Sequence, residues 1–510
     1  MKTNTNISNL KELLERSALD YPGVLAVKWA KGQQVYSKTY LQLQDDVKKI
    51  SQGIINSGFD KSHIAIIGQA SIYWIESFLA ITGSGNVAAL LDPLLPKDEL
   101  INLIIRSDSE VVFIEESNIL FGEKILHICP KVKKIYLLNE NGIKDIIQNV
   151  TSYDDHKIQK DDTAVIIFTS GTTGQSKGVM LSHYNLISNV DAVEYSVEPG
   201  KTLLSVLPIH HAFCLVMDYL KGFSLGATIC INDSYLHMLK NMSLFKPEVM
   251  LMVPMMVETI YKKLESSAGL WPKKLVASKA FGGNLKTVFV GGAHLDEYYI
   301  DKFASYGINI YEGYGMSECS PVISSNTPTD HKPGSVGKVL KNAHVAFEDG
   351  EILVQSTSVM KGYYKMPTET AETLKDGWLH TGDKGYIDED GYLFINGRVK
   401  NLIILSNGEN ISPEELENKL SLNKLIEEVV ITGEDNILTA RIYPDQELIK
   451  KKKWDAETVK SELQKLLDAF NRSQPTYRKI SRLVVRQNPF ARNTTKKILR
   501  QLALLDETAT

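Results

Sequence analysis

Short apolar runs rich in β-branched residues alternate along most of the chain with longer segments of helical periodicity. The runs at residues 64–67 (IAII), 164–168 (AVIIF) and 287–290 (TVFV) are each followed by a turn that contains glycine. Apolar strands separated by helices are typical of parallel sheets that helices cover on both faces. The pattern therefore predicts an α/β fold whose large N-terminal domain consists of parallel-rich sheets flanked by helices.

Hairpin signals appear after about residue 333. Asp349-Gly350 lies between AFE and EILV, and Asp390-Gly391 lies between YIDE and YLFI. Both dipeptides favour the primed turns that join two antiparallel strands. We therefore expect a smaller β subdomain at about 333–399, within a large domain that covers residues 1–399.

The pattern becomes α+β at Lys400. The strand-like run NLIIL leads into a polar loop. Ser412-Pro413-Glu414-Glu415 then combines a helix N-cap, a proline at the first helical position and a capping-box glutamate. We predict a small α+β C-terminal domain over residues 400–510.

Composition narrows the functional classes without changing the predicted fold. The 510 residues are 43% hydrophobic, 23% charged and 8% aromatic, as in ordinary globular proteins, and the formal net charge is -4. No global field would attract nucleic acid or an anionic membrane, so no nucleic-acid partner is predicted. The four cysteines are far apart and lack C-x-x-C spacing, which argues against disulfides and a cysteine zinc site.

The chain shows no pattern typical of export or membrane insertion. Its first residues read as an amphipathic helix that lacks the apolar core of a signal peptide. The apolar stretches at residues 72–95 and 249–257 are interrupted by polar residues or are too short to span a bilayer. We therefore expect no transmembrane segment and a cytoplasmic location.

The clearest chemical signal is the run FTSGTTGQSKGVMLSH at residues 168–183. It follows an apolar strand, and Ser182 is placed to cap a following helix. Glycines permit backbone conformations that turn several N–H groups towards one anion, hydroxyl groups add donors, and a lysine adds a mobile charge. The spacing differs from the Walker A pattern. The predicted phosphate-binding residues are Thr169, Ser170, Gly171, Thr172, Thr173, Gly174 and Lys177.

The run TSGTTG-x-x-KGV resembles the signature of the adenylate-forming superfamily of AMP-binding enzymes, and the chain is similar to acyl-CoA synthetases. Further family motifs follow in the expected order: YGMSE (314–318), TGD (381–383), GRVKNLI (397–403) and TTKKILR (494–500). The resemblance implies a reaction in which a carboxylate attacks the α-phosphorus of ATP, giving an acyl-adenylate and pyrophosphate, before a thiol displaces AMP. It also implies Mg²⁺ at the phosphates, where charge accumulates.

Several positions match the family's nucleotide-binding residues. Glu318 resembles the carboxylate that binds Mg²⁺, and Ser317 stands where the family usually has threonine. Asp383 resembles the carboxylate that accepts both ribose hydroxyls, and Arg398 would bind the same sugar or a phosphate. The positions that the resemblance places around the adenine and its phosphates are Gly292, Ala293, Glu312, Tyr314 and Gly315.

The resemblance also assigns catalytic and conformational roles. His211 matches the histidine that closes the acyl pocket against the adenylate, with His210 as the competing candidate. Lys497 matches the lysine that bridges the substrate carboxylate and the α-phosphate. Lys496 stands where the family usually has glycine, which leaves the assignment open between the two lysines. Lys400 matches the hinge about which a mobile C-terminal domain rotates between the two half-reactions.

Two further features belong to the predicted C-terminal domain. Gly408, in the loop Ser406-Asn407-Gly408, would reach the pantetheine channel after the rotation and would permit close backbone approach. Residues 471–500 contain nine basic residues and no acidic one. Attraction to the phosphates of ATP or CoA is the simplest interpretation of this basic run.

The substrate acid is predicted to have a neutral tail. The stretch at residues 210–220 is apolar through Met217, and Asp218 comes too late to hold the ammonium group of an amino acid. Residues 253–264 and 358–383 look most like fatty acyl-CoA synthetases, which favours a fatty acid, with an aryl acid as the alternative. The acceptor is either CoA or the phosphopantetheine of an acyl carrier protein, because both present the same thiol arm.

Two readings from other functional classes stand beside this one. A non-catalytic nucleotide-binding relative is one, but every expected charged residue is present, which argues against it. A luciferase-like oxidoreductase shares the same motifs.

Overall fold

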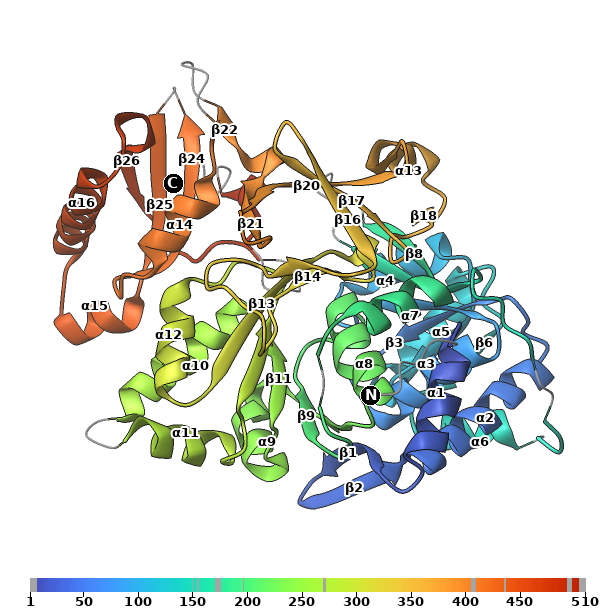
Figure 1. The fold of residues 1–510 in the computed structure, drawn as a ribbon. Coiled ribbons are helices and arrows are strands. Elements are labelled where there is room, and N and C mark those ends of the chain that lie inside the picture. The colour runs from blue at the N-terminus through green and yellow to red at the C-terminus, as the bar shows by residue number, and fades with distance from the viewer. Residues whose placement is uncertain are drawn as a thin grey trace. The chain divides into compact units, whose positions relative to one another are not determined.

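The chain divides into two compact units, whose elements are labelled in Figure 1. Unit 1 comprises residues 1–346, 353–381 and 387–393, and unit 2 comprises residues 347–352, 382–386 and 394–510. The computed structural model describes residues 7–148, 150–153, 156–169, 176–195, 197–268, 272–404, 410–434, 437–492 and 498–503.

The first sheet of unit 1 has a parallel centre. Its order is β15 (Lys338–Val339), β14 (Val322–Ser325), β13 (Asn309–Gly315), β12 (Thr287–Val290), β11 (Val249–Met252), β9 (Thr202–Ser205), β10 (Thr228–Ile231), β1 (Leu25–Lys31) and β2 (Gln34–Thr39). All neighbours from β13 to β1 pair in parallel, whereas β2, β14 and β15 are added antiparallel. The carboxyl ends of the parallel strands therefore meet at one edge.

The second sheet of unit 1 is built in the same way. Its order is β18 (Gly362–Tyr363), β8 (Lys177–Ser182), β7 (Thr163–Thr169), β4 (Val87–Leu91), β3 (His63–Ile67), β5 (Ser109–Ile114) and β6 (Lys134–Leu137). Strands β7 to β6 pair in parallel, and β8 and β18 are antiparallel. These two sheets confirm the predicted α/β fold with parallel-rich sheets.

Helices cover both faces of the second sheet. The helices of unit 1 are α1 (Leu10–Asp20), α2 (Tyr40–Asn56), α3 (Ile72–Gly83), α4 (Lys97–Arg106), α5 (Ile119–Ile128), α6 (Glu140–Ile147), α7 (His183–Ala192), α8 (Lys221–Ser224), α9 (Met238–Phe245), α10 (Pro254–Ala268), α11 (Lys273–Phe281), α12 (Glu297–Ser305) and α13 (Pro367–Thr373). Shorter helical turns are η1 (Glu116–Asn118), η2 (Cys214–Leu220), η3 (Tyr235–His237) and η4 (Ser317–Cys319).

Strand β3 shows why its sequence is apolar throughout. Ile64 and Ile66 pack into a core shared with α1, α2 and α3, whereas Ala65 and Ile67 pack into a second core with α4 and α5. Successive side chains of a strand point to opposite faces of the sheet. A strand covered by helices on both faces therefore needs apolar residues at every position.

The segment around the predicted phosphate loop confirms one expectation and adds an element. Ser182 caps α7, since its side chain accepts a hydrogen bond from the Asn185 amide (3.0 Å), and the Asn185 side chain accepts one from the Ser182 amide (2.9 Å). Between the loop and this helix lies strand β8, which pairs antiparallel with β7. The loop therefore connects the two strands of a hairpin, with Thr169 opposite Lys177.

The hairpins after residue 333 belong to a third sheet. Its strands are β16 (Ala343–Glu348), β17 (Glu351–Ser356), β20 (Trp378–Ile387) and β19 (Leu374–Lys375), with β21 (Leu393–Arg398) paired to β20. Both residues of Asp349-Gly350 have positive φ (49° and 80°), which confirms the primed turn there. The primed turn predicted at Asp390-Gly391 is wrong. Only Gly391 of this pair has positive φ (85°), and its amide donates to the Asp388 carbonyl (3.0 Å), so the turn starts earlier and is longer.

Unit 2 has its own sheet and core. Its further elements are β22 (Ile403–Ile404), β23 (Asn410–Ile411), β24 (Ile426–Glu434), β25 (Ile437–Pro444), β26 (Ile480–Val485), α14 (Pro413–Ser421), α15 (Gln446–Lys452), α16 (Ala456–Arg472), η5 (Val399–Asn401), η6 (Thr476–Arg478) and η7 (Arg500–Leu502). Strands β24, β25 and β26 form one sheet, and their apolar side chains pack with α14 and α16.

Helix α14 begins where the sequence predicts, but its first turn is capped differently. Pro413 is the first helical residue and Ser412 is the N-cap. The Ser412 side chain makes no cap hydrogen bond to the backbone; its hydroxyl donates to Glu414 Oε2 (3.1 Å) instead. The predicted capping box is therefore wrong, because the Ser412 hydroxyl oxygen accepts no backbone N–H of the first turn.

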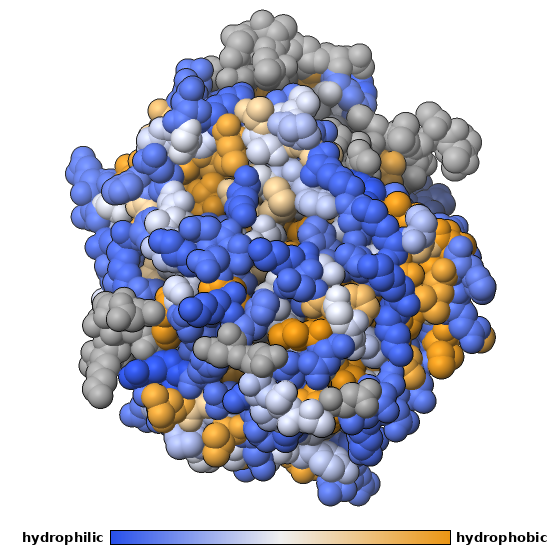
Figure 2. Space-filling view, turned by 90° about the vertical axis from the view of Figure 1, so that its right-hand side faces the viewer, coloured by the Kyte–Doolittle hydropathy of each residue, from blue (hydrophilic) through white to orange (hydrophobic). Residues whose placement is uncertain are grey.

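The state of the cysteines and the polarity of the surface are those expected from the composition. Cys129, Cys214, Cys230 and Cys319 are buried free thiols, which confirms the expected absence of disulfides. The face shown in Figure 2 is mainly hydrophilic, and hydrophobic residues are scattered over it in small groups. Among the described residues, every helix falls short of the length or the apolarity needed to cross a bilayer.

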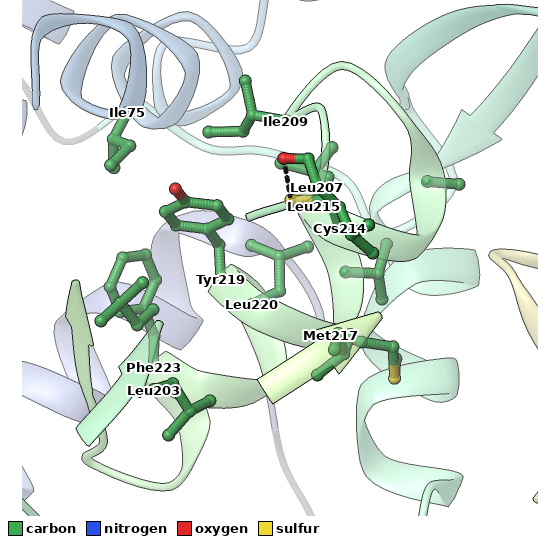
Figure 3. Packing of buried hydrophobic residues seen from close by; sticks show 14 of the residues in the cluster. Ile75, Leu203, Leu207, Ile209, Cys214, Leu215, Met217, Tyr219, Leu220 and Phe223 are labelled. Atoms are coloured by element: carbon green, nitrogen blue, oxygen red, sulfur yellow. Dashed lines mark hydrogen bonds between the residues drawn. The ribbon is translucent and has the colours of Figure 1, made fainter. Parts of the chain in front are cut away.

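Helix η2 carries a carboxyl group into the core of unit 1. This helix has π-type hydrogen bonding, and Figure 3 shows its apolar side chains packed together. Asp218 is 0% exposed, and its Oδ2 lies 3.6 Å from the Cys214 thiol, which also donates to the Leu207 carbonyl (3.2 Å). Asp218 Oδ1 has no hydrogen-bond partner among the described residues. Burial raises the pKa of this carboxyl to about 7.

The raised pKa of Asp218 predicts a pH-dependent stability. The unfolded chain ionises this carboxyl near pH 4, so the folded state binds more protons between about pH 4 and pH 7. The free energy of unfolding should therefore fall as the pH rises through this window and stay lower above it. Asp218→Asn removes the buried charge. Its melting temperature should exceed that of the wild type by a few degrees at pH 8.5 and by less at pH 5.5, in thermal unfolding followed by circular dichroism.

Asp301→Asn is the matched control, because Asp301 lies exposed on α12. A difference between Asp218→Asn and wild type that is the same at both pH values would contradict the prediction.

Candidate active site

The candidate site of unit 1 begins at the carboxyl ends of two neighbouring parallel strands. Val290 of β12 pairs with Glu312 of β13, so the residues after them lie side by side. Gly291 lies so close to its surroundings that an added Cβ would be 3.5 Å from the Gly313 carbonyl and 3.2 Å from the Phe213 ring. Phe213 comes from the segment after β9, so three strand ends converge here. In open parallel sheets, this edge is where ligands bind.

Two of the predicted glycines are required by the backbone at this edge. Gly292 has φ +83°, a left-handed conformation that other residues rarely adopt. An added Cβ at Gly315 would lie 2.0 Å from the Pro321 carbonyl, whose oxygen accepts the Met316 amide (2.9 Å). A side chain at either position would displace the edge of the predicted nucleotide site.

Glu312 is a buried carboxyl whose pKa is raised. Its side chain is buried, Oε1 accepts the Leu295 amide (3.2 Å), and Oε2 has no partner among the described residues. Burial raises its pKa to about 8, and the nearby charges of Glu297 and Asp296 act in the same direction. A protonated carboxyl offers a donor as well as an acceptor, and both suit the edge of a purine base.

The predicted metal carboxylate is held by Tyr363, a residue outside the sequence motifs. The Tyr363 hydroxyl donates to Glu318 Oε1 (2.8 Å), and the Met360 amide donates to the Glu318 carbonyl (2.8 Å). The Lys177 ammonium lies 4.6 Å from the centre of the Tyr363 ring. Tyr363 therefore touches both the predicted metal ligand and the predicted phosphate-binding lysine. The only sequence signal was its place in the GYY run after β17.

The phosphate loop itself is described only at its two ends. Thr169 and Lys177 are paired across the hairpin, and the Thr169 hydroxyl lies 3.5 Å from the Lys177 carbonyl. Arg106, at the end of α4, donates to the Ser176 carbonyl (2.7 Å) and lies over the Phe168 ring. Arg106 thus contacts the residues on both sides of the loop. The sequence does not indicate this role. The remaining predicted loop residues lie outside the described residues: Ser170, Gly171, Thr172, Thr173 and Gly174.

The two histidines lie next to each other after β9. His210 is buried, and its Nε2 is 3.6 Å from Asp92 Oδ2 at the end of β4. His211 is less buried, its amide donates to the Pro208 carbonyl (3.1 Å), and the two rings are 4.4 Å apart. The His210 ring therefore lies next to a carboxylate of the second sheet. The pocket role of His211 stays a prediction.

The predicted ribose residues belong to unit 2. Asp383 on β20 is buried, and Arg398 at the end of β21 donates from Nε to Asp383 Oδ1 (2.8 Å). The arginine therefore orients the carboxylate, in addition to any contact of its own. Lys400 is exposed in η5, and its hinge role stays a prediction. Gly408 and Lys497 lie outside the described residues.

Most of the arginines in the basic run of residues 471–500 form ion pairs within unit 2. Their main role is therefore to pair with these carboxylates and not to attract phosphates. The partners are carboxylates on α14 and β24: Arg478 pairs with Glu415, Arg482 with Glu434, Arg492 with Glu428, and Arg500 with Glu414 and Glu417. The sequence pattern missed these pairs because the acids lie 48 or more residues earlier in the chain.

Comparison with models of known families identifies the family of this chain. The family model described as AMP-binding enzyme matches residues 14–364. The chain belongs to the AMP-binding enzyme family. The model described as AMP-binding enzyme C-terminal domain matches residues 400–506. The resemblance stated from the motifs is confirmed, and this AMP-binding enzyme is a ligase of the AMP-forming acid–thiol type.

Similar proteins share this chain over most of its length. Long-chain-fatty-acid–CoA ligase 5 of Rattus norvegicus is 30% identical over 488 residues, which cover 80% of this chain and 71% of that protein. A long-chain-fatty-acid–CoA ligase of Bacillus subtilis is 34% identical over 370 residues, which cover 68% of this chain and 62% of that protein. The solved structure of anthranilate CoA ligase AuaEII with anthranoyl-AMP has the same fold, with a TM-score of 0.84, 19% identity and 99% coverage of both chains.

The contacts of Tyr363 predict a specific effect on nucleotide binding by this AMP-binding enzyme. Tyr363→Phe removes the hydroxyl that orients Glu318 and keeps the ring under Lys177. We expect the Mg²⁺ concentration that half-saturates ATP binding to rise about tenfold, because partners of metal ligands contribute about that much to metal affinity. ATP binding without Mg²⁺ should stay within about twofold. Isothermal titration calorimetry at several Mg²⁺ concentrations measures both.

Tyr364→Phe is the control, since the Tyr364 hydroxyl donates to Asp108 (2.7 Å) rather than to Glu318. Equal Mg²⁺ dependence in Tyr363→Phe, Tyr364→Phe and wild type would show that the Tyr363–Glu318 bond has no part in metal binding.

Proposed function

We propose that this enzyme activates a fatty acid with ATP and transfers the acyl group to CoA. In the first step, a carboxylate oxygen of the acid attacks the α-phosphorus of ATP, the bond to the β-phosphate oxygen breaks, and pyrophosphate leaves. In the second step, the thiol of CoA attacks the acyl carbon, a thioester forms, and AMP leaves with the bonding electrons. The family membership and the two fatty-acid ligases described above support this assignment.

The observation that carries the proposal is the Lys177–Tyr363–Glu318 constellation. It places a cation and a carboxylate on two sides of one tyrosine, beside the strand that ends the phosphate loop. A phosphoryl transfer needs both signs of charge, because the cation binds phosphate oxygens and the carboxylate binds the metal that accompanies them. Mg²⁺, when bound, would neutralise charge on the phosphates.

The donor set around Glu318 fits Mg²⁺. Among the described residues, no group of three or more His, Cys, Asp and Glu side chains is placed to hold a metal by itself. Mg²⁺ commonly takes one or two carboxylates from the protein and its other ligands from substrate phosphates and water. Glu318 is a single hard oxygen donor of this kind, and its orientation is set by Tyr363.

The other named residues bind and orient the substrates in this proposal. Glu312, Tyr314 and the Gly292–Ala293 backbone hold the adenine, and Asp383 accepts the ribose hydroxyls. The Lys497 ammonium bridges the acid and the α-phosphate, where it stabilises the charge of the transition state. The hinge at Lys400 and the close approach at Gly408 serve the second step.

The preference for a neutral tail rests on the apolar run through Met217, which is buried in η2. A small pocket between α3 and η2 is lined by apolar side chains and tyrosine: Trp74, Ile75, Phe78, Leu79, Ile209, Leu215, Tyr219, Leu220 and Phe223. Figure 3 shows Tyr219 and Leu220 together with Ile75 and Ile209 around this space. Its cavity volume of about 10 Å³ admits no more than one water molecule, so it is a gap in the core and too small for an acyl chain. An aryl acid is the alternative substrate, and a carrier-protein phosphopantetheine is the alternative acceptor.

Acid-dependent exchange of pyrophosphate into ATP tests the function directly. Fatty acids of several chain lengths should support exchange, whereas amino acids should not. AMP should accumulate with turnover only when CoA is added. Exchange with aryl acids alone would replace the fatty acid by the aryl alternative, and exchange without CoA-dependent turnover would favour a carrier protein.

The assignment of Lys497 predicts a split between the half-reactions. Lys497→Ala should lower acid-dependent exchange by about 100-fold or more, because it removes a charge aimed at the transition state. Thioester formation from a supplied acyl-adenylate and CoA should stay within about threefold. Lys496→Ala is the matched control and should leave exchange within about threefold. A larger loss of exchange in Lys496→Ala than in Lys497→Ala would move the role to Lys496.

A further inference from the structure

We propose that Asn189 is a positioning residue that holds Glu318 for metal binding, because it fixes the turn that joins η4 to β14. The inference rests on the proposed function, since it takes the metal role of Glu318 from there. Asn189 lies on α7, the helix that follows the hairpin of the phosphate loop, and is 0% exposed. It lies outside the sequence motifs.

The side-chain amide of Asn189 binds the chain on both sides of the turn. Its Nδ2 donates to the Cys319 carbonyl (3.3 Å), at the end of η4, and to the Val322 carbonyl (2.8 Å), at the start of β14. Its Oδ1 accepts the Val322 amide (3.2 Å). Because a backbone amide can only donate, this contact decides which end of the Asn189 amide faces Val322. Asn189 therefore pairs with the backbone of Val322 as a neighbouring strand would.

The same turn is bonded from the segment between β17 and β18. Ser358 in this segment is 0% exposed, and its hydroxyl accepts a hydrogen bond from Asn189 Nδ2 (3.2 Å). The Ser358 carbonyl accepts the Ser320 hydroxyl (2.8 Å), and the Met360 amide donates to the Glu318 carbonyl (2.8 Å). The turn that carries Glu318 is thus held by α7 and by the chain before β18 together.

This buried network connects the two charged groups of the proposed phosphate site. Helix α7 begins directly after β8, whose first residue is Lys177, and the turn that Asn189 holds carries Glu318. A buried network of hydrogen bonds rigidifies the groups that it joins. A carboxylate that binds Mg²⁺ needs such a fixed position, because the metal demands short distances and a nearly octahedral geometry. We therefore expect the loss of Asn189 to displace Glu318, although Asn189 itself would not touch the metal.

Asn189→Ala tests the inference through ATP binding. We expect the Mg²⁺ concentration that half-saturates ATP binding to rise about tenfold, while ATP affinity without Mg²⁺ stays within about twofold, because residues that orient metal ligands act on metal affinity. Isothermal titration calorimetry at several Mg²⁺ concentrations measures both. A general loosening of the fold would weaken ATP binding equally with and without Mg²⁺.

Asn241→Ala is the matched control. Asn241 is also a buried asparagine on a helix of unit 1, but its Nδ2 donates to Asn232 (2.7 Å) and Asp233 (2.8 Å), which follow β10. Its loss should lower the melting temperature, as the loss of Asn189 should, because each change removes a buried hydrogen-bonding group. The Mg²⁺ dependence of Asn241→Ala should stay near that of the wild type.

Ser358→Ala is a milder second variant. It removes one partner of Asn189 and leaves both contacts to Val322 in place. We expect it to raise the half-saturating Mg²⁺ concentration about threefold, in the same direction as Asn189→Ala. If Asn189→Ala does not fold, Ser358→Ala decides the inference.

Hydrogen exchange of the Met360 amide reports on the turn without metal or substrate. This amide bonds to the Glu318 carbonyl and not to Asn189. It should exchange at least about fivefold faster in Asn189→Ala than in Asn241→Ala, because a turn that has lost its anchor opens more often.

Equal Mg²⁺ dependence in Asn189→Ala and Asn241→Ala would overturn the inference, as would equal exchange of the Met360 amide in the two variants. ATP binding by the wild type that is independent of Mg²⁺ would refute the metal role of Glu318, and the inference with it. A wild type that binds ATP with Mg²⁺ but shows no acid-dependent pyrophosphate exchange would refute the proposed function alone.

Discussion

The hydrogen bond from Tyr363 to Glu318 connects the two large sheets of unit 1 at the candidate site. Tyr363 is on β18, which extends the second sheet next to the hairpin of the phosphate loop, and Glu318 follows β13 of the first sheet. Each sheet presents the carboxyl ends of its parallel strands, but a site needs groups from both. A single hydroxyl, with its ring under Lys177, brings the cation of one sheet to the carboxylate of the other.

Several buried carboxylates among the described residues have a fixed partner. Glu318 is oriented by Tyr363 and Asp383 by Arg398, while Glu417 pairs with Arg500 and Glu428 with Arg492. A buried charge is tolerated only when its partners satisfy it, so each of these groups has few available orientations. Glu312 and Asp218 show the other solution, in which burial raises the pKa and the carboxyl holds its proton to a higher pH than a free carboxyl does.

The sequence predicted the elements whose signals are local. The cap of α7 by Ser182 and the primed turn at Asp349-Gly350 depend on a few neighbouring residues, and both were correct. Strand β8 was missed because its short apolar run lies inside a glycine-rich motif and is stabilised by β7 and β18. The capping box of α14 failed because the Ser412 side chain contacts the Glu414 carboxylate and accepts no backbone N–H, an orientation that sequence spacing does not reveal.

The sequence alone determined the fold class, the order of the motifs and the family, because periodicity and motif spacing are properties of the chain itself. Only the tertiary structure showed which charges are already paired. The basic run of residues 471–500 looks like a phosphate-binding face in one dimension, but most of its arginines bind carboxylates of α14 and β24. Tyr363 and Arg106 likewise became functional candidates only through contacts across long sequence separations. Such contacts depend on how strands and helices are brought together, and no local pattern records them.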